Sequence, residues 1–230
     1  MIISHRHKFI FLKTTKTAGT SIEIALSKFC GPDDIITPIT QEDEQIRRKL
    51  GYPGPRNFLA PWWNYGIKDL IVLIRTKRKK RLYYNHIPAS LVRKHVGKDV
   101  WDGYFKFCVE RNPWDRAVSF YFWKNREEPR IPFSEYVDSK APVILRKNGF
   151  GVYTIDGEVA VDRICRFEHL AEDLEAVRNR LGLQEKLELP RAKSRFRKSE
   201  GGYQGIYGEA EKAKIAELFS DEIRRFGYEF

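Results

Sequence analysis

Four short apolar runs along the chain have the length and composition of β-strands. They cover residues Lys8–Lys13, Leu70–Ile74, Phe105–Val109 and Ile164–Phe167. The run at Leu70–Ile74 contains no polar residue, which is typical of a strand in the middle of a parallel sheet. Asp156-Gly157 lies between two further short runs, Val152–Ile155 and Glu158–Val161, and predicts a small hairpin.

Between these runs, apolar residues recur three or four positions apart, which is the spacing of one helix face. Thr40 with Asp43, Pro88, and Asn112-Pro113 are helix-start signals, whereas Gly31-Pro32, Gly182 and Gly227 are stop signals. The stripes include Ile22–Phe29, Ile46–Leu50, Leu91–His95, Leu170–Leu181 and, as the last helix, Ile215–Ile223. Alternating strands and helices predict an α/β layered domain with a mainly parallel sheet. No linker divides the chain, so we expect a single domain over residues 1–230.

The composition is that of a globular protein. Of the 230 residues, 42% are hydrophobic and 32% are charged. The longest apolar runs, Leu70–Ile74 and Ala117–Trp123, are too short to span a membrane, and the N-terminus lacks a signal-peptide pattern. Cys30, Cys108 and Cys165 form no Cys-x-x-Cys pair, so we expect reduced, structural thiols and a cytoplasmic protein.

The charge balance is strongly basic and indicates an anionic partner. The 42 Lys and Arg exceed the 31 Asp and Glu by 11, and the sequence pI is about 9.5. A nucleic acid, a membrane surface, a nucleotide or an acidic polymer would each satisfy this excess. Two basic clusters stand out, Arg75–Arg81 and Arg191–Lys198. Clusters of this kind are usually solvated surfaces, so they do not identify the partner alone.

The segment Lys16-Thr17-Ala18-Gly19-Thr20-Ser21 connects the first predicted strand to a predicted helix. Unpaired backbone N–H groups and the positive end of the helix dipole bind phosphate-like anions at such a position. Gly19 permits close approach of a ligand, the hydroxyl groups are donors, and Lys16 adds a positive charge. A helix that is merely capped would need neither Lys16 nor three hydroxyl groups. We therefore interpret the segment as an anion-binding loop.

This loop is not a Walker A motif, because its Lys precedes the Gly. An Asp that could hold Mg²⁺ is also missing after Leu70–Ile74, where Arg75 follows, and Glu110 is the one residue that could replace it. Phosphoryl transfer normally uses Mg²⁺. A sulfuryl group carries less negative charge and can be moved by positive side chains alone, so the loop favours sulfuryl transfer.

A second candidate anion site lies in the stretch from Phe107 to Tyr121. Arg111 ends a predicted strand, and Ser119 follows it by eight residues, about two helical turns. An Arg at a strand end and a hydroxyl on the next helix can converge on one phosphate. A buried salt bridge with an N-cap at Asn112 explains the same residues equally well.

Taken together, the two segments resemble the sulfotransferases that use 3′-phosphoadenosine 5′-phosphosulfate (PAPS). That family has a Lys-Thr-Gly/Ala-Gly-Thr-Ser loop for the 5′-phosphosulfate and an Arg-Asn-Pro-x-x-Arg-x-x-Ser segment for the 3′-phosphate. Both are present here, as Lys16–Ser21 and Arg111–Ser119. The stretches Arg166–Leu170 and Asp221–Phe230 also resemble bacterial and carbohydrate-type members of the family. Thr15 departs from the pattern, in which Pro commonly precedes the Lys.

The resemblance implies a three-layer, P-loop-like nucleotide-binding fold with a parallel sheet and a small hairpin insertion. It implies PAPS as co-substrate, no required metal, and transfer of a sulfuryl group to a hydroxyl of a carbohydrate or glycolipid-like acceptor. Lys16 would neutralise the bridging oxygen of the leaving nucleotide. The expected nucleotide-binding residues are Lys16, Thr17, Ala18, Gly19, Thr20, Ser21, Arg111, Ser119, Arg195, Arg197 and Lys198. We expect the Arg75–Arg81 cluster to lie at the same sheet edge and to bind an anionic acceptor.

Transfer to a hydroxyl is helped by a general base, a role that suits histidine at neutral pH. His86 lies between the run at Leu70 and the helix after Pro88, on the ligand side of the predicted sheet. We expect His86 to be the base, with Glu23 as the rival because other branches of the family use a carboxylate. A structural His in an aromatic loop is the alternative.

Two other functions remain open at this level. A P-loop-type nucleotide kinase would require Mg²⁺ and ATP. A basic nucleic-acid-binding protein would bind DNA or RNA in a salt-sensitive way that does not depend on Lys16. The motifs disfavour nucleic acid as the partner, and they leave the acceptor and the oligomeric state undefined.

Overall fold

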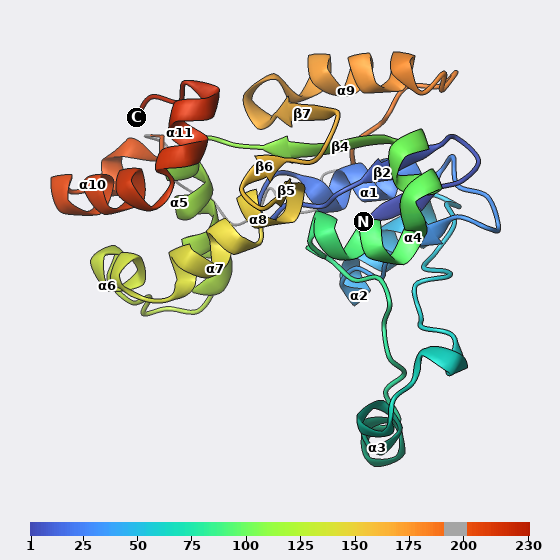
Figure 1. Ribbon diagram of the computed structural model, residues 1–230. Helices are drawn as coiled ribbons and strands as arrows, with labels where there is room; N and C mark the ends of the chain where they lie inside the picture. The colour runs from blue at the N-terminus through green and yellow to red at the C-terminus, as the bar shows by residue number, and fades with distance from the viewer. Residues whose placement is uncertain (191–201) are drawn as a thin grey trace.

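A five-stranded sheet with the strand order β3–β1–β2–β4–β7 organises the structure, a computed structural model that describes residues 1–190 and 202–230 (Figure 1). β2, β4 and β7 pair in parallel, whereas β1 is antiparallel to both β2 and β3. Four of the five strands therefore run in one direction, which confirms the predicted mainly parallel sheet. The strands are β1 (Ile2–Ser4), β2 (Phe9–Phe11), β3 (Ile35–Ile36), β4 (Phe105–Glu110) and β7 (Arg163–Arg166).

Both faces of this sheet are covered, which gives the expected three layers. On one face, Phe11 and Phe107 pack against Leu26 of α1 (Gly19–Ser27) and Val177 of α9 (Leu170–Arg180). On the other face, the sheet packs against α4 (Ala89–Gly103), α8 (Phe150–Tyr153) and the hairpin of β5 (Thr154–Ile155) and β6 (Glu158–Val159). Asp156 and Gly157 form the hairpin turn with φ angles of 53° and 84°, as the Asp-Gly pair predicts.

A second group of helices forms its own apolar cluster beside the sheet (Figure 1). Its buried residues include Trp114, Tyr136 and Phe219. The helices are α5 (Pro113–Lys124), α6 (Phe133–Asp138), α7 (Ala141–Lys147), α10 (Glu209–Leu218) and α11 (Ser220–Phe226). The single last helix predicted over Ile215–Ile223 is therefore two helices, which meet at the non-helical Phe219.

Two predicted helix caps are confirmed. The Thr40 side chain accepts a hydrogen bond from the Asp43 backbone N–H at the start of α2 (Gln41–Lys49). The Asn112 side chain accepts from the backbone N–H groups of Trp114 and Asp115 at the start of α5. These bonds satisfy helix donors that have no partner inside the helix, which is why the two helices begin there.

The prediction of a central strand at Leu70–Ile74 is wrong. These residues lie in α3 (Ile67–Thr76), which stands apart from the sheet and its covering helices (Figure 1). The Asp69 carboxylate accepts from the Gly66 backbone N–H at 3.0 Å and stabilises the start of the helix. The sheet instead gains β1 and β3, whose three and two residues are too short to give a strand signal in the sequence.

The three cysteines have free, buried thiols, as expected. Cys108 and Cys165 lie in β4 and β7, where they pack as small apolar side chains. Among the described residues, none of the helices combines the length and the apolar character needed to cross a membrane.

Candidate active site

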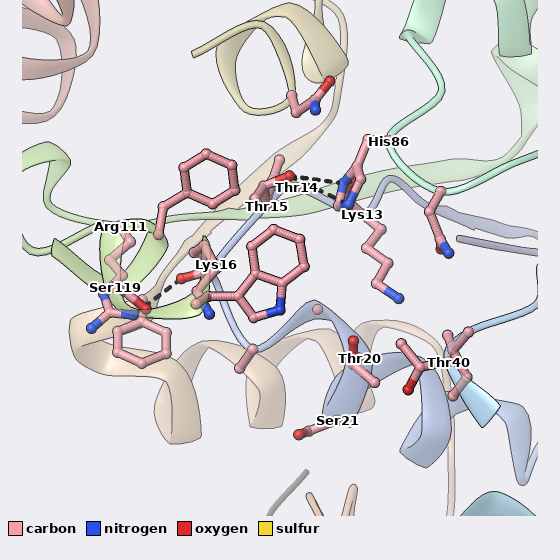
Figure 2. Close-up of a pocket in the computed structure, with 18 of the residues that line it drawn as sticks. Lys13, Thr14, Thr15, Lys16, Thr20, Ser21, Thr40, His86, Arg111 and Ser119 are labelled. Carbon is pink, nitrogen blue, oxygen red and sulfur yellow. Dashed lines mark hydrogen bonds between the residues drawn. The ribbon is translucent and has the colours of Figure 1, made fainter. Parts of the chain in front are cut away.

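A cavity of about 740 Å³ lies at the carboxyl ends of β2 and β4 (Figure 2). Arg111 and Ser119 are at one end, His86 and Thr40 are at the other, and Lys16 with the start of α1 lies between them (Figure 2). Of the predicted site residues, those that line the cavity are Lys16, Ala18, Gly19, Thr20, Ser21, His86, Arg111 and Ser119. Arg195, Arg197 and Lys198 are outside the described residues.

The loop before α1 has an unusual backbone that brings it close to β2. Lys16 and Ala18 have φ angles of 66° and 59°, in the left-handed region that non-glycine residues rarely adopt. Ala18 is the N-cap of α1 and provides no side-chain cap. A Cβ atom on Gly19 would lie 2.8 Å from Lys13 Cγ and 3.2 Å from the Thr14 carbonyl oxygen. Glycine is therefore required at position 19, where the first helix turn can offer backbone N–H groups to an anion.

The side chain of Thr17 has a different position from the one predicted. Thr17 is fully buried and does not line the cavity, and its hydroxyl lies 2.7 Å from that of Thr14. The Thr14 hydroxyl also donates to the carbonyl of Val109 in β4. The Thr17 hydroxyl therefore holds the loop against the sheet, so Thr17 can reach a ligand in the cavity only through its backbone.

Arg111 joins the two predicted anion-binding segments. Its Nη1 donates to the Lys16 carbonyl at 3.1 Å, while Nε and Nη2 donate to the Asp115 carboxylate at 2.8 and 2.6 Å. The guanidinium carbon lies 4.0 Å from the centre of the Phe167 ring. Asp115 and Phe167 thus fix the direction of the guanidinium group, and Ser119, two turns into α5, lines the same cavity.

A buried ion pair lies directly behind this region. Arg116 Nη1 donates to Glu110 Oε1 at 2.6 Å, and its Nε donates to the Thr15 carbonyl at 2.9 Å. The other oxygen of Glu110 accepts from the Tyr153 hydroxyl at 2.8 Å. Both carboxylate oxygens of Glu110 are thus hydrogen-bonded, to Arg116 and Tyr153, and Glu110 does not line the cavity. Glu110 was the one residue that could have replaced a magnesium-binding Asp. Within residues 1–190 and 202–230, no three metal-ligating side chains cluster.

His86 lies in the wall of the cavity with a defined orientation. Its Nδ1 is 2.8 Å from the Lys13 carbonyl oxygen, and the Thr15 hydroxyl lies 3.2 Å from Nδ1 and 3.3 Å from Nε2. Because a carbonyl oxygen only accepts, the Nδ1 atom carries the proton and Nε2 is the proton acceptor. Burial, reinforced by the charge of Lys13, lowers the pKa of His86 to about 4. The imidazole is therefore neutral at physiological pH and able to accept a proton.

Glu23, the rival base, lies in a different environment. It is fully buried behind the cavity wall, where Lys13 Nζ is 2.8 Å away, the Met1 amino group 3.2 Å and Arg47 Nη2 3.5 Å. Burial alone would raise the pKa of Glu23, but these positive charges outweigh it and lower the pKa to about 2. Glu23 does not line the cavity and its carboxylate is engaged by these positive groups, so it has no access to a hydroxyl bound there.

The sequence prediction missed several residues of the cavity wall. They include Lys13, Thr40, Asn85, Phe122, Trp123 and Asn148. Lys16 Nζ is 5.8 Å from the centre of the Trp123 ring. Trp123 follows Ser119 by four residues, so a shared helix face was a usable signal for it. Asn148 reaches the site through tertiary packing, since its carbonyl accepts from the Thr15 N–H at 2.9 Å.

The predicted position of the first basic cluster is wrong. Arg75 and Thr76 end α3, and residues 77–81 follow this helix and not a central strand; none of residues 75–81 lines the cavity. The cluster was placed at the sheet edge only because Leu70–Ile74 was interpreted as a strand. The cations of this cluster are therefore not part of the cavity wall.

Comparisons with known proteins address the family. Residues 1–148 match the Sulfotransferase family. This range contains the Lys16–Ser21 loop, His86 and the Arg111–Ser119 segment. A protein of Archaeoglobus fulgidus, described as uncharacterized, is 38% identical over 108 residues, which are 45% of this chain and 88% of that protein. The structure of mouse sulfotransferase SULT7A1 complexed with PAP is 16% identical, with a TM-score of 0.47, and the match covers 96% of this chain and 86% of that one. The match over residues 1–148 confirms the family expected from the two motifs: the chain belongs to the sulfotransferase family.

Proposed function

We propose that the protein transfers a sulfuryl group from PAPS to a hydroxyl of a carbohydrate or glycolipid-like acceptor. The observation that carries this proposal is the meeting of three distant segments in one cavity: the Lys16–Ser21 loop, the Arg111–Ser119 segment and His86. The volume of about 740 Å³ is in the range of pockets that hold ligands of nucleotide size.

The arrangement of the cavity suits a nucleotide with two anionic ends. Backbone N–H groups at the start of α1 and the Lys16 side chain would bind the 5′-phosphosulfate. Arg111 and Ser119, at the end marked by Phe167, would bind the 3′-phosphate. Arg111 already directs its guanidinium group through Asp115, which reduces the side-chain entropy that is lost when it binds a phosphate.

The opposite end of the cavity would hold the acceptor. The acceptor hydroxyl oxygen forms a bond to sulfur while the bond from sulfur to the bridging phosphate oxygen breaks. His86 Nε2 takes the hydroxyl proton, and Lys16 compensates the charge that develops on the leaving oxygen. Thr40 and Asn85 near His86 provide polar groups, and Trp123 provides an aromatic surface, a combination suited to a sugar.

The direct test is transfer of radioactive sulfate from labelled PAPS to a panel of oligosaccharides and glycolipids. We expect transfer that survives EDTA and that falls at least about a hundredfold in Lys16→Ala, because Lys16 would stabilise charge in the transition state. The exposed Lys94 of α4 offers the matched control, Lys94→Ala, which should retain the wild-type rate. Absence of both PAP binding and sulfate transfer, or phosphate transfer from ATP that requires Mg²⁺, would refute the proposal.

A further inference from the structure

Residues 62–81 form a separate projection, which we call the arm. It contains Trp62, Trp63, the helix α3 and the basic cluster, and α3 stands well away from the sheet in Figure 1. The segments that lead into and out of the arm are held together at its base by a bridge between Leu59 and Arg81. The arm is therefore a distinct extension of the chain, closed at its base and different in composition from the rest of the fold.

One face of α3 is apolar and is left exposed by the part of the chain that the structure describes. Ile67, Leu70, Ile71 and Ile74 have the spacing i, i+3, i+4 and i+7, which places them in one stripe along the helix. All four are exposed, Ile67 at 80% and Ile74 at 75%. Trp62 and Trp63 just before the helix are also exposed, at 80% and 69%. Water thus contacts a continuous set of large apolar side chains, which usually marks an interaction surface.

The same arm carries most of the excess charge of the protein. It contains seven Lys and Arg against one acidic residue, Asp69, so its net charge is +6 of the total +11. Asp69 is itself paired with Lys80 at 2.7 Å. Lys68 and Arg75 lie along one border of the apolar stripe, next to Ile71, and the other cations follow the helix directly. The arm therefore combines an apolar stripe, two exposed tryptophans and a cationic border.

We propose that the arm docks on the surface of an anionic lipid bilayer. The stripe of α3 would enter the boundary between headgroups and acyl chains, the tryptophans would lie at the interface, and the cations would face anionic headgroups. A second copy of the chain fits less well, because pairing of two arms would bring two charges of +6 together. Charge complementarity therefore selects the anionic bilayer.

The arm also connects to the catalytic cavity. Asn85 and His86, which line the cavity, follow the end of the arm at Arg81 by four and five residues. Docking of the arm would hold this wall of the cavity near the lipid surface, where a membrane-borne acceptor would be presented. The docking itself rests on α3 and its flanks and does not depend on the proposed reaction.

Vesicle binding tests the proposal without any measurement of activity. The probe is a set of unilamellar vesicles with about 30% phosphatidylglycerol in phosphatidylcholine, compared with vesicles of phosphatidylcholine alone. We expect binding to the anionic vesicles that weakens at high salt. Ile67→Ser/Ile74→Ser should weaken it about thirtyfold or more through lost apolar burial. Arg78→Glu/Lys79→Glu should weaken it by a similar factor.

Matched controls separate the arm from the rest of the surface. Arg93→Glu/Lys94→Glu makes the same change in net charge on the exposed side of α4, and Val143→Ser removes an exposed apolar side chain of α7. Both should bind within about threefold of wild type, and all variants should keep the wild-type Tm. When the phosphatidylcholine of the anionic vesicles is brominated on its acyl chains, it should quench the tryptophan fluorescence of the wild type. It should not quench that of Trp62→Phe/Trp63→Phe.

Three results would overturn the proposal. One is a wild-type protein that does not bind anionic vesicles, and another is equal loss of binding in the arm and control charge variants. The third is a dimer in light scattering that Ile67→Ser/Ile74→Ser dissociates, which would identify a second copy as the occupant of the stripe. Failure of sulfate transfer with intact vesicle binding would refute the proposed reaction and leave the docking arm in place.

Discussion

The Nδ1 atom of His86 lies 2.8 Å from the carbonyl oxygen of Lys13. This backbone carbonyl accepts the Nδ1 proton and so determines which ring nitrogen of His86 is protonated. The Lys13 side chain is in turn paired with Glu23 at 2.8 Å. A polar chain therefore runs from Glu23 through Lys13 to His86. Its far end is a buried carboxylate that is ionised at neutral pH, and its near end is a neutral imidazole in the cavity.

The first prediction concerns His86 as the base. The φ angle of His86 is 61°, which Asn tolerates better than Ala does, so His86→Asn is the variant of choice. We expect kcat for sulfate transfer to fall by about 10²–10⁴-fold, with the KM for PAPS within about threefold. Steady-state kinetics with labelled PAPS would show this. A kcat close to that of wild type would remove His86 from proton transfer.

The second prediction is the pH dependence of kcat/KM. Because the pKa of His86 is lowered to about 4, its imidazole is neutral throughout the range from about pH 6 to pH 8. We expect kcat/KM to change less than about twofold over that range. A histidine with the ordinary pKa of about 6.5 would lose about three quarters of its basic form at pH 6. A profile with a midpoint near 6.5 would contradict the environment described for His86.

The third prediction concerns the loop before α1. In Gly19→Ala the new methyl group would meet Lys13 and the Thr14 carbonyl, so the loop must shift. We expect a loss of about 1–3 kcal/mol in the free energy of unfolding and a weaker affinity for PAP, measured by denaturation and calorimetry. Gly103→Ala is the control, because no atom of residues 1–190 or 202–230 lies within 4 Å of a Cβ at position 103. Equal behaviour of the two variants would show that the close approach at Gly19 has no effect.

The fourth prediction concerns the buried carboxylate. In Glu23→Gln the charges of Lys13 and Arg47 lose their shared partner, and the free energy of unfolding should fall by about 3–5 kcal/mol. Glu44→Gln, which affects a partly exposed pair with the same Arg47, should cost less than about 1 kcal/mol. Urea denaturation of both variants compares them. A loss for Glu23→Gln as small as that for Glu44→Gln would show that the buried network is not stabilising.

The lowered pKa values of Glu23 and His86 also contribute to the acid sensitivity of the protein. The pKa of Glu23 is about 2 in the folded chain, so its contribution is present above the ordinary pKa of 4.5 and is lost as the pH falls toward 2. The pKa of His86 is about 4 against an ordinary 6.5, so the unfolded chain binds the additional proton in between. Both effects lower stability as the pH falls, which denaturation at several pH values would measure.

The fifth prediction assigns Arg111 to one phosphate of the nucleotide. Arg111→Ala should weaken binding of 3′,5′-ADP at least about thirtyfold but should change the affinity for 5′-AMP, which lacks the 3′-phosphate, by less than about threefold. Ser119→Ala should show the same preference with a smaller effect. Calorimetric titration of both nucleotides gives the comparison. An equal loss for both nucleotides would place Arg111 elsewhere on the ligand, or in the structure of the loop alone.

The elements that could be predicted from the sequence are those with local physical causes. Thr40, Asn112 and the Asp156-Gly157 turn act through bonds within a few residues, and the structure confirms all three. The positions of Lys16 and Arg111 in one cavity also followed from the sequence, because both segments come directly after parallel strands whose ends meet at one edge.

The features that could not be predicted have two causes. Some depend on packing between distant residues, and others lie in apolar runs too short to distinguish the spacing of a helix from that of a strand. Leu70–Ile74 has five apolar residues in succession, which suits a buried strand as well as a helix whose stripe begins earlier, at Ile67. The inward direction of the Thr17 side chain depends on Thr14, whose hydroxyl donates to the carbonyl of Val109 on another strand. The low pKa of Glu23 depends on Arg47 and on the Met1 amino group, which no local pattern associates with α1.

Arg116 has a consequence for how the catalytic region can vary between related proteins. Arg116 belongs to the second motif, but its side chain donates to the carbonyl of Thr15, next to the first motif, and to the carbonyl of Leu145 in α7. The two motifs are thus fastened to each other directly and not through the chain that separates them. Evolution is therefore free to lengthen, shorten or replace the arm, which lines no part of the cavity, while the chemistry at the cavity stays the same.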